Sequence, residues 1–117
     1  MNPVMYNYTQ LDPAQLEFVE IVPQDQLPPG ERLFIEVGGK SIVIFNLAGS
    51  YFAIGDVCTH DSGPVGDGDI EGDEIICPRH GARFDVRTGE VLALPAFEPV
   101  PTYEVRVEGD DILVESY

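Results

Sequence analysis

The chain of 117 residues carries 21 acidic and six basic side chains, which give a formal net charge of −15. This length fits one domain, and the acidic excess argues against nucleic acid or an anionic membrane as a partner. A basic protein surface remains a suitable partner, although the charge could equally serve solubility. No apolar run approaches 18 residues, so we expect no membrane-spanning helix.

The N-terminal segment, residues 1–16, has no clear hydrophobic period and contains Pro3 and Pro13. We expect it to form an arm, flexible or laid over the surface, ahead of a single domain at residues 17–117. Its first ten residues, M-N-P-V-M-Y-N-Y-T-Q, lack a basic region and an apolar region, so we expect no signal peptide.

Residues 17–56 show the period-2 alternation of β-strands and no convincing helix. Pro23 stops the first run, and Gly38-Gly39 separates the next two. Two adjacent glycines favour a type I′ hairpin, which requires positive φ twice. The predicted strands are residues 17–22, 32–37, 40–47 and 51–56. The last three predict an antiparallel meander that ends just before Cys58.

A ligand pattern then occupies residues 58–80. It is C-x-H, sixteen residues, then C-x-x-H, and it contains every cysteine and histidine of the chain: Cys58, His60, Cys77 and His80. Two thiolates and two imidazoles suit zinc or an iron–sulfur centre. Structural zinc sites usually pair like ligands, whereas here each short pair has one Cys and one His. This favours a two-iron cluster over a mononuclear Cys2His2 zinc site, and both over residues that merely pack.

The pattern resembles that of the Rieske family, in which two histidines replace two cysteines on one iron of a [2Fe–2S] cluster. The resemblance runs from about residue 17 to the end of the chain. It implies one [2Fe–2S] cluster, with Cys58 and Cys77 on one iron and His60 and His80 on the other. It also implies an all-β fold, a Rieske-like antiparallel β base with an inserted cluster-binding subdomain at about residues 54–99.

The remaining elements fit that layout. The acidic, glycine-rich run G-P-V-G-D-G-D lacks a lysine and a following helix, so we expect tight turns and close backbone approach rather than phosphate binding. Three proline residues make P-A-F-E-P-V-P stiff and extended. The resemblance places its Pro95–Pro99 part over the cluster, and a plain connector is the alternative. The predicted strands are residues 74–77, 82–86 and 91–94, followed by a hairpin over residues 102–117.

Two further residues near the ligands have open interpretations. Arg79 lies between Cys77 and His80, and it either docks a partner or is a solvated or aspartate-paired arginine. Gly81 either permits a close approach or is an ordinary turn glycine.

The resemblance also implies a low reduction potential. High-potential Rieske proteins carry a further cysteine in each ligand loop, which form a disulfide, and the matching residues here are Gly63 and Arg79. Those proteins also place hydroxyl groups near the sulfurs, where this chain has Ala82 and Phe84. Both absences, and the net negative charge, oppose the addition of an electron.

We therefore predict an electron carrier rather than an enzyme, passing electrons from a reductase to an oxygenase or similar acceptor. No nucleophile–base pair remains once both histidines bind metal. The alternatives are an accessory Rieske subunit of an iron–sulfur assembly or reductase complex, and a structural zinc module. Because no cysteine is left for a disulfide, we expect a reducing, cytoplasmic setting.

Overall fold

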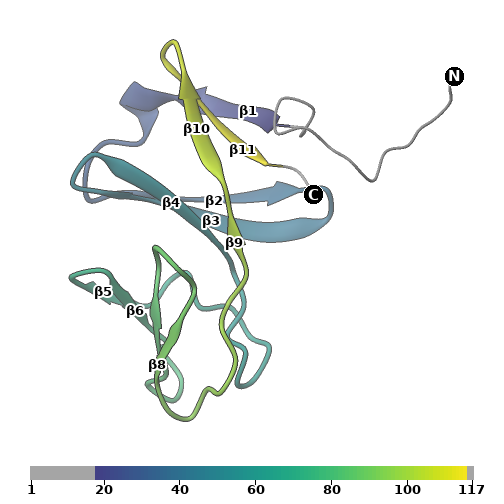
Figure 1. Ribbon diagram of the computed structural model, residues 1–117, viewed down its shortest axis with the longest axis vertical. Coiled ribbons are helices and arrows are strands. Elements are labelled where there is room, and N and C mark those ends of the chain that lie inside the picture. Colours follow the sequence, from purple (N-terminus) through teal and green to yellow (C-terminus); the bar gives the residue numbers. More distant parts are fainter. Residues whose placement is uncertain (1–17, 116–117) are drawn as a thin grey trace, which may run out of the picture.

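Three antiparallel sheets make up residues 18–115, the part of the chain that the computed structural model describes (Figure 1). The first has strand order β1-β11-β10, the second β2-β3-β4-β9 and the third β5-β6-β7-β8. The helical content of these residues is a 3-10 turn, η2 (Gln24–Gln26), so the all-β prediction is confirmed. The strands are β1 (Phe18–Pro23), β2 (Arg32–Val37), β3 (Lys40–Leu47), β4 (Ser50–Gly55), β5 (Asp69–Glu71), β6 (Glu74–Ile76), β7 (Arg83–Asp85), β8 (Val91–Ala93), β9 (Thr102–Tyr103), β10 (Val105–Glu108) and β11 (Asp111–Glu115). The predicted arm, residues 1–16, lies outside the described residues.

The β2–β3 hairpin has the predicted turn. Val37 pairs with Lys40, and between them Gly38 and Gly39 have φ values of 58° and 78°. Positive φ at both central residues matches the right-handed twist of the flanking strands. The strand order β2-β3-β4 confirms the antiparallel meander.

The predicted C-terminal hairpin is correct only in part. Its first strand divides at Glu104: β9 pairs with β4 in the second sheet, whereas β10 pairs with β11 in the first. The backbone N–H of Glu104 donates to the Glu115 carboxylate at 2.6 Å, and the Glu115 N–H donates to the Glu104 carbonyl at 3.0 Å. Alternation continues unbroken when a strand passes from one sheet to the next, so the sequence pattern gave no sign of the change.

Two details of the third sheet did not follow from the sequence. Strand β5 was not predicted, because it has three residues and only Ile70 is apolar. Asp85, in β7, is a charged residue that is only 8% exposed, because Arg87 supplies it with both backbone and side-chain hydrogen bonds.

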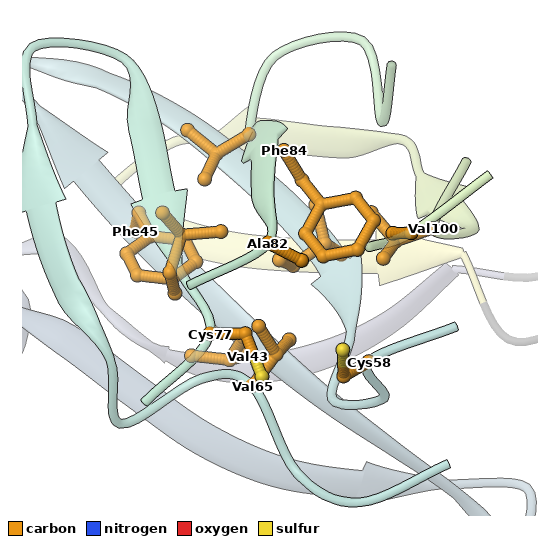
Figure 2. Close-up of a cluster of buried hydrophobic side chains, with 12 residues drawn as sticks. Val43, Phe45, Cys58, Val65, Cys77, Ala82, Phe84 and Val100 are labelled. Carbon is orange, nitrogen blue, oxygen red and sulfur yellow. The ribbon is translucent and has the colours of Figure 1, made fainter. Parts of the chain in front are cut away.

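Two hydrophobic clusters join the three sheets. One lies between the first two sheets and includes Ile42, Ile44 and Ile112. The other joins the second and third sheets, and it contains both cysteines together with Val43, Phe45, Val65, Ile75, Ala82, Phe84 and Val100 (Figure 2). The predicted ligand cysteines are thus part of the core where β3 and β4 meet the β5–β8 sheet. Within residues 18–115, no helix is long and apolar enough to cross a membrane.

Candidate metal centre

Two short loops present the predicted ligands, and we call them the first ligand loop (residues 58–64) and the second ligand loop (residues 77–82). In the first, the Cys58 N–H donates to the Gly63 carbonyl at 2.6 Å, and the Cys58 carbonyl accepts from Ser62 at 2.7 Å. In the second, the Cys77 N–H donates to the Ala82 carbonyl at 2.7 Å. Each loop is therefore closed by the backbone of its own cysteine, which fixes where the thiol points.

The two thiols are buried and free. Cys58 is 0% and Cys77 1% exposed, and neither forms a disulfide. Their sulfur atoms lie within 4.8 Å of each other and of a carboxylate oxygen of Asp61. Burial raises the pKa of the Cys58 thiol, and nearby Cys77 adds to this, while the backbone N–H groups of His60 and Asp61 oppose it. Because a thiol must lose its proton to bind metal, loading of this site releases protons.

The two imidazoles lie on the solvent side of the thiols. The ring centroids of His60 and His80 are 4.9 Å apart, with the rings at 87°. Both residues are exposed, and the side chain of His80 is 54% accessible. Their ring nitrogens and an Asp61 oxygen also lie within 4.8 Å of one another. The structure thus brings all four predicted residues together, with sulfur inside and nitrogen outside.

Asp61 is a residue of this site that the sequence analysis did not single out. Its carboxylate lies near all four predicted ligands but is engaged by Arg79, whose Nε and Nη2 donate to it at 2.5 and 2.9 Å. This ion pair holds the pKa of Asp61 well below its usual range. The carboxylate is therefore committed to the arginine rather than free as a metal ligand. The signal in the sequence was symmetry: Asp61 directly follows the first histidine, and Arg79 directly precedes the second.

Arg79 thus pairs with an aspartate, as one of its two interpretations held. It also covers Gly63, where an added Cβ would lie 2.9 Å from the guanidinium carbon. Gly81 has φ 78° and no atom within 4 Å of an added Cβ, so its turn conformation, not crowding by the protein, favours glycine there.

The proline-containing segment lies against the first ligand loop. The Thr59 hydroxyl donates to the Glu98 carbonyl at 2.6 Å, and Ala96 is buried in the same cluster as the two cysteines. Beside it, Leu94 and Phe97 are 69% and 79% exposed. This segment therefore encloses the thiols on one side and presents large apolar side chains to solvent.

The glycine-rich run between the ligand loops is tied to the second sheet. Asp56 accepts from the backbone N–H of Val65 at 2.9 Å and of Gly66 at 2.6 Å. Arg32 donates to the carbonyls of Gly66 and Gly68 at 2.5 and 2.7 Å. A Cβ at Gly68 would lie 1.9 Å from a backbone oxygen of Ile76. The predicted close backbone approach is confirmed at this glycine.

Comparison with known proteins identifies the family. Residues 17–104 match the Rieske [2Fe–2S] domain, and the chain belongs to this family. It is 40% identical over 100 residues to the ferredoxin component of biphenyl 2,3-dioxygenase from Rhodococcus jostii strain RHA1, covering 86% of this chain and 94% of the relative.

Solved structures agree with this assignment. The ferredoxin of carbazole 1,9a-dioxygenase from Nocardioides aromaticivorans IC177 matches with a TM-score of 0.80 and 37% identity, over 86% of this chain and 98% of that one. A second match, from a complex of reduced oxygenase and oxidised ferredoxin in carbazole 1,9a-dioxygenase, has a TM-score of 0.78 and 27% identity, over 85% of this chain and 93% of that one.

The family decides between the two centres that the ligand pattern allowed. A Rieske domain holds one [2Fe–2S] cluster, and the donors present here fit it. Two buried thiols form one pair and two exposed imidazoles the other, which is the donor set for two unlike irons.

Proposed function

We propose that this chain is a low-potential Rieske ferredoxin that carries single electrons from a reductase to an oxygenase or a similar acceptor. Cys58 and Cys77 hold one iron of the cluster, and His60 and His80 hold the other. The observation that supports this best is the arrangement of two buried thiols beneath two exposed imidazoles. Such an arrangement binds a redox centre firmly and leaves one edge open to a partner.

The bound cluster supplies the redox chemistry, a one-electron change at iron. The protein does the rest. The apolar side chains around the thiols, among them Val65, Ala82 and Phe84, exclude water from the sulfur side. The backbone N–H groups of His60 and Asp61 lower the pKa of the Cys58 thiol, so they favour negative charge on that sulfur. The Asp61 N–H also donates to the Cys58 carbonyl at 3.2 Å. The imidazoles of His60 and His80 form the short path between the cluster and a docked protein.

The low potential is supported by what surrounds the sulfurs. Ala82 and Phe84 are both fully buried in the cluster of core residues that contains the cysteines, and neither has a hydroxyl group. Since hydrogen bonds to sulfur favour the reduced form, their absence disfavours reduction. The backbone N–H groups near Cys58 favour the reduced form instead, so they limit how low the reduction potential can be.

The relatives support the choice of partners. They are named as ferredoxin components of dioxygenase systems, and one structural match comes from a complex with an oxygenase. Electron carriers of this kind, rather than catalytic subunits, are what those names describe.

We propose a cytoplasmic setting, since both cysteines are assigned to the cluster. We also propose a single domain at residues 17–117, with the cluster-binding unit at about 54–99.

Metal analysis and electron transfer together test this function. Anaerobically purified protein should contain about two irons and two labile sulfides per chain, and Cys77→Ser should lose them. Reduced holoprotein should then pass one electron to an oxygenase component of a dioxygenase system. One zinc and no sulfide would refute the cluster. A protein that holds the cluster but reduces no oxygenase, and instead copurifies with cluster-assembly or reductase proteins, would support the accessory role.

A further inference from the structure

Arg79 connects the two ligand loops through three nitrogens of its guanidinium group. Nε and Nη2 bind the Asp61 carboxylate at 2.5 and 2.9 Å, and Nη1 donates to the Pro64 carbonyl at 2.7 Å. The Asp61 carboxylate also accepts the N–H of Gly63 at 3.0 Å. The arginine of one loop is therefore fixed in position by a carboxylate that is itself held by the turn of the other loop.

The loops have few other direct links. Apart from the contact between the two thiols, no other hydrogen bond within residues 18–115 joins the first ligand loop to the second. His80 adds a longer approach, with Nδ1 3.7 Å from the Asp61 carboxylate. On the exposed side the rings of His60 and His80 also meet, with centroids 4.9 Å apart. Within residues 18–115, the hydrogen bonds of Arg79 are therefore the polar links between the two loops on this side.

A second arginine provides a comparison. The side chain of Arg83 is as exposed as that of Arg79, at 35% against 33%. Its Nη1 binds Glu71 at 3.0 Å and Glu74 at 3.3 Å. All three of these residues belong to strands of the third sheet, β5, β6 and β7. Arg83 therefore makes a surface ion pair of similar type that does not connect the ligand loops.

We propose that Arg79 and Asp61 form a non-covalent brace that holds the two ligand loops together and thereby retains the cluster. Arg79 is a positioning residue in this role. A planar guanidinium with two bonds to one carboxylate and a third to a carbonyl fixes a geometry that a lysine ammonium does not reproduce. The brace rests on the ligand assignment proposed above, because it acts on the loops that carry those ligands.

The test uses two variants that change the brace but differ in charge. Arg79→Lys keeps a cation beside the cluster and loses the two-bond geometry. Asp61→Asn keeps an acceptor for the Gly63 N–H and loses the anion. Loss of the visible absorption of the holoprotein in excess chelator should be about fivefold faster in both, the effect of a well-formed ion pair. The reduction potential should stay near the parent's value in Arg79→Lys and rise in Asp61→Asn.

Arg83→Lys is the matched control, and it should release its cluster at the parent's rate. Release at the parent's rate in both brace variants would overturn the proposal. So would a shift in potential without faster release, since the pair would then act only as local charge. Equal acceleration in Arg83→Lys would point to general stability and also refute the brace. Failure of the proposed function itself looks different, because the parent protein would then carry no [2Fe–2S] absorption at all.

Discussion

At the scale of single residues, hydrogen-bond donors near the sulfurs tune the reduction potential of the bound cluster. Ala82 and Phe84 stand where the resemblance to high-potential Rieske proteins places hydroxyl groups near the sulfurs. Both are fully buried, so a new hydroxyl needs a hydrogen-bond partner there, and the two cysteines lie in the same core cluster. The backbone groups that lower the pKa of the Cys58 thiol come from His60 and Asp61, and no side-chain pattern in the sequence revealed them.

Ala82→Ser and Phe84→Tyr should each raise the reduction potential, and the double variant should raise it more. Rieske centres span roughly −150 to +300 mV, and we expect the parent near the lower end. For a one-electron couple, about 59 mV is a tenfold change in equilibrium, so one new hydrogen bond to sulfur is measurable. Protein-film voltammetry of the three variants checks this. A parent midpoint well above zero would show that the backbone donors dominate.

The ionisation of Asp85 should make the stability of the protein depend on pH. The side chain and backbone of Arg87 hold the pKa of this buried carboxyl below its usual range. Its stabilising effect is therefore fully present above the pKa of an aspartate in the unfolded chain, about 3.9. The effect is lost as the pH falls through the lower pKa of Asp85 in the folded protein. Asp85→Asn should lower the free energy of unfolding at pH 7 by about 1–2 kcal/mol, and the difference from the parent should shrink below about pH 4.

Urea unfolding of the holoprotein, followed by tyrosine fluorescence, measures this difference. Asp73→Asn is the matched control, because Asp73 meets the same arginine at 3.5 Å but is 46% exposed. It should change stability far less. A constant difference between Asp85→Asn and the parent from pH 7 to pH 3 would contradict the linkage.

At the scale of elements, one buried amide joins a strand to two loops. Asn46, in β3, is 2% exposed. Its Nδ2 donates to the Leu27 carbonyl at 2.8 Å, and its Oδ1 accepts from the Gly49 N–H at 2.8 Å. The side chain therefore fixes the loop after η2 and the turn between β3 and β4.

Asn46→Ala should lower the free energy of unfolding by about 2–3 kcal/mol, because it leaves a backbone carbonyl and a backbone N–H without their partners. Chemical denaturation of the holoprotein measures the loss. Ser41→Ala, at an exposed position of the same strand, is the control and should change stability by less than about 0.5 kcal/mol. Equal effects of the two substitutions would mean that Asn46 is not a structural link.

Elements with a clear period were predictable, and connections between elements were not. The Gly38-Gly39 hairpin follows from local conformational preference, and the four candidate ligands follow from their spacing. The division at Glu104 depends on which sheet offers a free edge, which is a tertiary fact. The Arg79–Asp61 pair joins residues 18 positions apart within irregular loops. A pair so far apart in the sequence leaves no periodic pattern, so only the folded backbone shows that these two side chains meet.

At the scale of the whole molecule, the cluster is expected to contribute to folding. The ligand loops and the third sheet are connected by short strands and glycine-rich turns, while β2–β4 form a longer meander. Binding free energy at such a site is partly folding free energy. In apoprotein, amides of β5–β8 should lose protection from hydrogen exchange while those of β2–β4 keep theirs.

Hydrogen exchange followed by mass spectrometry compares the two states. Because Val43, Phe45 and Ile54 pack into the same core cluster as the cysteines, we expect a small loss at these residues of β3 and β4 as well. Equal protection of the second and third sheets without metal would show that the cluster-binding unit folds without its cofactor.

The exposure of the two neighbouring histidines also affects how the protein meets its partners. On the sulfur side, electrons would have to cross the hydrophobic core that surrounds Cys58 and Cys77. The donor and the acceptor must therefore approach the same small face, and they cannot be bound there together. Such a carrier binds its partners one after the other: it is reduced by one protein, diffuses away and is oxidised by another. An excess of either partner then slows the overall rate of electron transfer from donor to acceptor, because it occupies the face that the other partner needs.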